Sequence, residues 1–149
     1  MEAANGQLKK VLVVCTGNTC RSPMAEGWLN HKLAGKGWIA YCARSDNGSW
    51  DIFLARPDGS NPRNLTNTPD WEEAGPLFSW DGGRMLYRRL AKGEVIHHDQ
   101  WGFMGELVLA DANGKNPEVF GKAQEYAWAC WSPDGKQISC LTRREIQIV

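Results

Sequence analysis

The stretch that decides the fold class is "WDIFLARPDGSNPRNLTNTPDWEEAGPLFSWDGG", residues 50–83. It alternates short apolar runs with segments rich in Gly, Pro, Asn and Asp. Apolar runs bounded in this way predict short strands joined by tight turns. The Asp58-Gly59 pair supplies a position where the chain can adopt φ > 0, as tight hairpins require. The stretch therefore predicts antiparallel β-structure.

The same pattern returns further along the chain. "DIFLARPDGSNP" (51–62) matches "ELVLADANGKNP" (106–117), and "FSWDGGRMLY" (78–87) matches "WSPDGKQISC" (131–140) at nearly the same offset. Three further segments are copies of one strand: 38–45, 84–91 and 137–144. A period of about 50 residues with several strands per unit is typical of propeller blades. The sequence thus predicts a mainly β protein.

Residues 37–149 resemble the TolB-like β-propeller repeat, whose strands follow the patterns "IAY", "W-D-I-F-L", "L-T-N" and "W-S-P-D-G-K". The resemblance is carried by residues 50–83 and by "WSPDGKQISCL" (131–141). The final "EIQIV" (145–149) looks like the opening of another copy. The resemblance implies a partial β-propeller of two blades and the start of a third. Such propellers generally act as rigid scaffolds that bind proteins or ligands.

The first 36 residues follow a different pattern. "VLVVC" (11–15) is a continuous apolar run, which predicts a strand covered on both faces. From Pro23 onward, apolar residues recur at helical spacing. No second strand–helix unit follows, so we expect the strand to lack partners. We divide the chain into a strand–phosphate loop–helix segment (1–36) and the propeller repeats (37–149), both incomplete.

The segment "VCTGNTCRSP" (14–23) has the residues of an oxyanion grip. Five residues separate Cys15 from Arg21, so the intervening backbone N–H groups can curl around a tetrahedral anion, and the following helix directs its positive end at it. That field favours the nucleophilic thiolate of Cys15. Arg21 can bind two phosphate oxygens. The predicted phosphate-binding residues are Thr16, Gly17, Asn18, Thr19, Cys20, Arg21 and Ser22.

"VLVVCTGNTCRSPMAEG" (11–27) closely resembles the N-terminal segment of the low-molecular-weight protein tyrosine phosphatases and their arsenate reductase relatives. The resemblance implies that Cys15 is the nucleophile and Arg21 the phosphate ligand. It also implies that Cys20 can trap oxidised Cys15 in a disulfide. The family's general acid stands in an Asp-Pro-aromatic motif, and this sequence contains no Asp-Pro dipeptide. We therefore expect phosphate binding in a non-catalytic scaffold, with phosphatase activity as the alternative.

The amino-acid composition limits the classes of binding partner that we expect. Seventeen basic and seventeen acidic residues cancel, which argues against nucleic acid and anionic membrane surfaces. We expect binding of a protein or self-association through exposed blade edges, and no cofactor. His97, His98 and Asp99 are interpreted as a polar loop, so no metal is expected. No signal peptide is visible, which predicts a cytoplasmic chain as written. A fragment or accidental fusion without function of its own is a further alternative.

Cysteines and tryptophans complete the expectations. Cys42, Cys130 and Cys140 lie among apolar residues, which predicts buried thiols. Four tryptophans stand beside predicted strands, and we expect them to fill the space between stacked sheets: Trp50, Trp80, Trp128 and Trp131.

Overall fold

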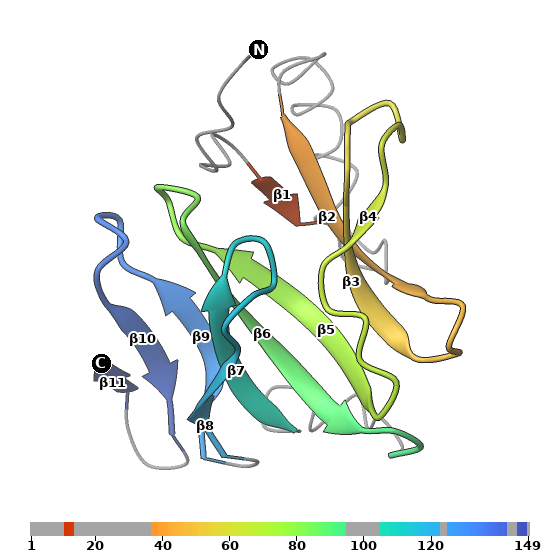
Figure 1. The fold of residues 1–149 in the computed structure, drawn as a ribbon. Coiled ribbons are helices and arrows are strands. Elements are labelled where there is room, and N and C mark those ends of the chain that lie inside the picture. Colours follow the sequence, from red (N-terminus) through yellow and green to blue (C-terminus); the bar gives the residue numbers. More distant parts are fainter. Residues whose placement is uncertain (1–10, 14–36, 95–104, 123–124, 143–145, 149) are drawn as a thin grey trace, which may run out of the picture.

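The structure is a computed structural model that describes residues 11–13, 37–94, 105–122, 125–142 and 146–148. Every regular element within these ranges is a strand, which confirms the prediction of a mainly β protein. The strands form three sheets that follow one another along the chain (Figure 1). The helix predicted after Pro23 lies outside the described residues. None of the described segments is a helix long and apolar enough to cross a membrane.

The first sheet has the strand order β1-β2-β3-β4. Its strands are β1 (Val11–Val13), β2 (Trp38–Arg44), β3 (Trp50–Ala55) and β4 (Arg63–Asn64). β2, β3 and β4 pair antiparallel. β1 pairs parallel with β2, with Val11 opposite Trp38 and Val13 opposite Ala40. The expectation that the apolar N-terminal strand lacks partners is therefore wrong, because the edge of β2 offers it backbone hydrogen-bonding groups.

The second and third sheets are antiparallel throughout. The second sheet contains β5 (Trp71–Phe78), β6 (Arg84–Ala91), β7 (Glu106–Asp111) and β8 (Glu118–Gly121). The third contains β9 (Ala127–Trp131), β10 (Ile138–Leu141) and β11 (Ile146–Ile148). The three segments predicted as copies of one strand form β2, β6 and β10, and each stands second in its sheet. The sequence repeat thus corresponds to strands that occupy the same position in three successive sheets.

The turn after β3 and the turn after β7 have the same backbone. Gly59 and Gly114 both have φ 81°, and Asn61 and Asn116 both have φ 53°. The same two backbone hydrogen bonds close each turn: Arg56 N–Ser60 O and Gly59 N–Arg56 O in the first, Asp111 N–Lys115 O and Gly114 N–Asp111 O in the second, all 2.9 Å. The turns predicted from Asp-Gly and Asn-Gly are confirmed.

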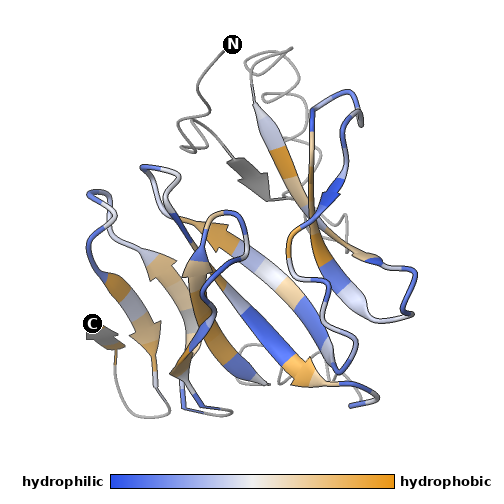
Figure 2. Ribbon diagram, in the orientation of Figure 1, coloured by the Kyte–Doolittle hydropathy of each residue, from blue (hydrophilic) through white to orange (hydrophobic). Residues whose placement is uncertain are grey.

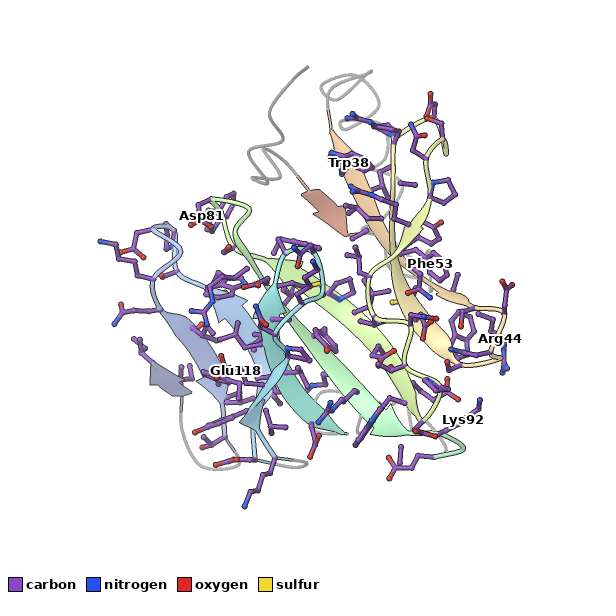
Figure 3. All side chains as sticks on the ribbon, in the orientation of Figure 1. Trp38, Arg44, Phe53, Asp81, Lys92 and Glu118 are labelled. Carbon is purple, nitrogen blue, oxygen red and sulfur yellow. The ribbon has the colours of Figure 1, made fainter. Side chains whose placement is uncertain are left out.

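A second kind of turn joins β5 to β6 and β9 to β10. The Ser79 hydroxyl donates to Asp81 Oδ1 (2.6 Å), and the Ser132 hydroxyl donates to Asp134 Oδ1 (2.5 Å). These hydrogen bonds lower the pKa of each aspartate. Figure 3 shows Asp81 at the tip of its hairpin. The predicted match of Ser79 with Ser132 is therefore a match of structure as well as of sequence.

The second sheet is buried on both faces. On β6, Met85 and Tyr87 pack with Ile52 of the first sheet, whereas Leu86 packs with Ile138 of the third. Successive side chains of a strand point to opposite faces, so one strand can serve both cores. Figure 2 shows hydrophobic residues mainly in the strands and hydrophilic residues in the turns, with hydrophilic stretches also within β5 and β6. The two cores therefore lie between successive sheets.

Two expectations about tryptophan have opposite outcomes. Trp131 is buried, and its indole N–H donates to Leu77 O (3.1 Å), so its predicted packing role is confirmed. Trp80 is 74% exposed, so the same prediction is wrong there. Trp80 stands in the β5–β6 turn, one position beyond Ser79, and not in a strand. Trp50 is half-buried, and the side chain of Trp128 lies outside the described residues.

The cysteine expectation also needs correction. Cys140 is buried, as predicted, and Cys42 is half-buried, but Cys130 is exposed. Cys130 precedes buried Trp131 in β9 and pairs with Ser139 of β10. Alternation along the strand therefore turns Cys130 away from the core that receives Trp131. The apolar neighbours of Cys130 in the sequence therefore led to a wrong prediction of its burial.

Candidate functional site

The predicted oxyanion loop follows β1. β1 is described as far as Val13, and all the predicted site residues, from Cys15 to Ser22, lie outside the described residues. Their roles therefore stay predictions. The strand that leads into the loop is placed: β1 lies at the edge of the first sheet and contacts β5. His97, His98 and Asp99 also lie outside the described residues.

The pairing of β1 with β2 bears on the loop. Parallel neighbours need a connection of a dozen residues or more, usually a helix, and here the connection is residues 14–37. That connection contains the predicted loop and helix. Ligands of open parallel sheets bind at the carboxyl ends of the strands. In the sequence, the predicted loop follows directly after the carboxyl end of β1.

The described residues contain a second cluster, which the sequence analysis missed. Ser49, Asp51 and Glu73 are polar side chains that are 0–1% exposed. Asp51 belongs to β3 and Glu73 to β5, and these two strands contact each other. A signal was present in the sequence, since Asp51 interrupts an otherwise apolar strand. We refer to Asp51 and Glu73 as the carboxyl pair.

Asp51 lies among hydrogen-bonding side chains. The Asn64 side-chain amide donates to Oδ2 (2.5 Å). The Ser49 hydroxyl lies 3.2 Å from Oδ1, but its single hydrogen is also within reach of Asn47 Oδ1 and Thr68 O. The Asn64 carbonyl oxygen in turn accepts from the backbone N–H groups of Thr66 (3.1 Å) and Asn67 (3.0 Å). The turn after β4 therefore orients the amide that faces Asp51.

Glu73 is less completely satisfied. The Thr68 hydroxyl donates to Oε1, whereas no donor among the described residues reaches Oε2. Burial raises the pKa of Glu73 to about 7. Hydrogen bonds from Thr68 and Thr66 oppose this shift, and the nearby carboxylate of Asp51 adds to it. A carboxyl group that changes protonation near neutral pH therefore lies between the first and second sheets.

The described ranges contain no group of three or more His, Cys, Asp or Glu side chains that could hold a metal ion. The carboxyl pair supplies two acidic side chains, and its remaining neighbours are hydroxyl and amide groups. The chemistry available there is proton binding and hydrogen bonding.

Comparisons with known proteins concern mainly the N-terminal segment. The sequence profile of the low molecular weight phosphotyrosine protein phosphatase family matches residues 10–48. An arsenate reductase of Staphylococcus aureus (strain N315) is 51% identical over 35 residues, which are 24% of this chain and 26% of that protein. An arsenate reductase of Staphylococcus xylosus is 49% identical over 35 residues, which again are 24% of this chain and 26% of that protein. The N-terminal segment is thus similar to this phosphatase family and to arsenate reductases.

A relative of another kind matches more of the chain. The uncharacterized protein YidR of Escherichia coli (strain K12) is 30% identical over 100 residues, which are 66% of this chain and 23% of that protein. An alignment of this length extends well beyond residues 1–36. The chain spans about a quarter of the length of the relatives named here. The phosphatase profile ends at residue 48 and therefore covers both β1 and β2.

Proposed function

We propose that the protein is a non-catalytic binding protein whose body consists of TolB-like propeller repeats and whose N-terminal loop holds a phosphate or a related oxyanion. The observation that carries the proposal for the body is the recurrence, 55 residues apart, of the turn at Gly59 and the turn at Gly114. Each turn follows the third strand of a sheet, as successive blades of one propeller require.

The parallel pair of β1 and β2 supports the proposal for the loop. It provides the strand end at which backbone N–H groups 16–21 would converge on an anion. Arg21 would bind two oxygens of that anion, and the Cys15 thiolate would lie against it. General acid catalysis contributes roughly 10²- to 10⁴-fold to a rate. Since the sequence has no Asp-Pro dipeptide to supply the acid, binding is favoured over hydrolysis.

The second candidate function is a low-molecular-weight protein tyrosine phosphatase. The match of that family's profile to residues 10–48 favours it. In this case Cys15 would attack the phosphorus atom and the alcohol would leave. Water would then hydrolyse the cysteinyl-phosphate. Arg21 would bind the equatorial oxygens in both steps, and the Ser22 hydroxyl would ease departure of the Cys15 sulfur.

One experiment separates the two functions. Binding of inorganic phosphate is measured by calorimetry, and hydrolysis of a small aryl phosphate is measured in parallel, for the wild-type chain, Cys15→Ser and Arg21→Ala. Arg84→Ala serves as a matched control because Arg84 is an exposed arginine of β6. We expect phosphate binding that Arg21→Ala weakens at least tenfold and Arg84→Ala leaves unchanged, without turnover. Turnover that Cys15→Ser abolishes would establish the phosphatase instead, and no binding at all would refute both.

The partner proposed for the body is a protein or a second copy of the chain. β11 lies at the edge of the third sheet, and its Ile146 and Ile148 are 73% and 68% exposed. An edge strand presents unpaired backbone groups that another strand can bind. The exposed isoleucines add apolar surface to that edge, which supports self-association there.

A further inference from the structure

The carboxyl pair lies at the contact between the first two sheets. Two other hydrogen bonds cross this contact nearby. The Trp50 N–H of β3 donates to Glu72 Oε2 of β5 (2.6 Å), and the Ser49 hydroxyl lies 3.2 Å from Thr68 O. Ile52, the residue after Asp51, packs in the core between the two sheets. A change in the charge of the pair therefore acts directly on the contact between the sheets.

The hydrogen bonds around the pair leave at least one oxygen without a hydrogen. Asp51 Oδ2 accepts from the Asn64 amide and Glu73 Oε1 accepts from the Thr68 hydroxyl, whereas Asp51 Oδ1 competes with Asn47 Oδ1 and Thr68 O for the single hydrogen of Ser49. Glu73 Oε2 is buried and accepts from no described residue. A buried oxygen without a partner costs about 1–3 kcal/mol, and an ionised one costs more. A proton on Oε2 would turn this oxygen into a donor, and the nearby Asp51 carboxyl group belongs to β3, the strand that contacts β5.

We propose that Asp51 and Glu73 share one proton in the folded protein and thereby clamp the first sheet to β5 in a pH-sensitive way. Solvent supplies the proton when the contact forms and receives it when the contact opens. With the proton, the pair carries one negative charge and Glu73 Oε2 has a hydrogen to share. Without it, two carboxylates face each other away from water, and the contact between the sheets weakens.

A metal cation is a poorer occupant of this position. The Asn64 amide and the Thr68 hydroxyl direct donors at the carboxyl oxygens, and a cation would have to displace them. A proton requires no such rearrangement.

The charged neighbours do not compensate the pair. β6 brings Tyr87, whose pKa burial raises to about 12 with a further contribution from the charge of Glu73. β6 also brings Arg89, which is bound to Glu106 and lies over the Trp71 ring. The remaining charged groups nearby are engaged elsewhere: Glu72 with the Trp50 N–H, and Arg44 of β2 with Gly48 O. No ion pair in the described part neutralises Asp51 or Glu73.

The sign of the pH effect follows from the direction of the shift. The pKa of Glu73 is about 7 in the folded state against an ordinary value of 4.5. Between these values the folded state holds a proton that the unfolded state has lost, so folding weakens as pH rises. The stabilisation is complete below pH 4.5 and disappears as pH passes 7. The equilibrium constant for unfolding should rise about thirtyfold between pH 5.5 and pH 8.

The test measures urea unfolding of the full chain at pH 5.5 and pH 8, together with a carbon-13 NMR titration of the glutamate side chains. Glu73→Gln supplies a fixed N–H donor, so we expect it to abolish the thirtyfold change. Glu118→Gln, at an exposed position on β8, should leave the change intact (Figure 3). The wild-type NMR titration should contain one glutamate with a midpoint near neutrality, which Glu73→Gln removes, whether or not this variant folds well.

Three results would overturn the proposal. The first is a wild-type unfolding constant that does not change between pH 5.5 and pH 8. The second is a glutamate with a near-neutral midpoint that persists in Glu73→Gln. The third is stabilisation at pH 8 by millimolar Ca²⁺ or Mg²⁺ in the wild type but not in Glu73→Gln, which would make the occupant a cation.

Discussion

The first and second sheets have the same repeat but use one of its positions differently. Asp51 of β3 and Glu106 of β7 stand 55 residues apart and begin the matching segments. Asp51 is fully buried and shares its surroundings with another acid, Glu73. Glu106 is partly exposed and binds Arg89: both Nε and Nη2 of Arg89 lie 2.8 Å from Glu106 Oε2. The repeat therefore determines the backbone at this position, and the neighbouring strand determines the chemistry.

The sheets also differ in their first strands. β5 pairs antiparallel with β6, whereas β1 pairs parallel with β2. β2 thus belongs to two patterns at once. It is the second strand of a repeat sheet, and it is also the parallel partner reached through the predicted loop and helix. The edge of a strand can pair with another strand through backbone hydrogen bonds and apolar packing, and the partner can run parallel or antiparallel.

The largest expected difference between the sheets lies in their cores. Met85 of β6 and Ile39 of β2 hold the same place in their strands, but Met85 is fully buried and Ile39 is half-buried. Met85→Ala should lower the free energy of unfolding by about 2–5 kcal/mol, because it leaves a cavity between two sheets. Ile39→Ala should cost about 1 kcal/mol, since less apolar surface is lost. Urea unfolding followed by tryptophan fluorescence measures both, and equal losses would contradict the different burial of the two faces.

This contrast shows what the sequence could predict. Alternating apolar residues and Gly- or Asn-containing turns are local signals, and they predicted the strands at 38–44, 84–91 and 138–141 together with the turns at Gly59 and Gly114. Which face of a strand is covered depends on the next sheet. For this reason the exposure of Cys130 was not predicted, and Trp80 was wrongly expected to pack because it stands in a turn beside a strand.

Pairing between segments far apart in the chain was not predicted from the sequence, for a related reason. The sequence of neither segment indicates its partner in the parallel pair of β1 and β2, or in the contact of β3 with β5 that carries Asp51 and Glu73. The roles of Cys15 and Arg21 rest on a local motif. They stay predictions, which the phosphate-binding experiment tests.

A second comparison concerns the two matching turns. Gly59 and Gly114 have the same φ, but a Cβ at Gly59 would meet nothing within 4 Å, whereas a Cβ at Gly114 would lie 1.9 Å from Leu65 O. Gly59→Ala should cost about 1–2 kcal/mol through left-handed backbone strain alone. Gly114→Ala should cost about 2–4 kcal/mol, because the turn must also move away from Leu65. Thermal unfolding of both variants tests this order, and a larger loss at Gly59 would mean that the two turns are not packed as described.

The smallest effect is expected at Glu106, and its salt dependence separates it from the carboxyl pair. The side chains of Arg89 and Glu106 are 21% and 30% exposed, so solvent screens their interaction. Glu106→Gln should therefore cost only about 0.2–1 kcal/mol, and the cost should shrink as salt is raised to about 0.5 M. The pH effect at Glu73 should persist in the same salt, because ions in solution do not reach a buried pair. Unfolding measurements at both ionic strengths compare the two acids directly. A cost at Glu106 that does not respond to salt would mean that this acid, like Asp51, is shielded from solvent by its neighbours.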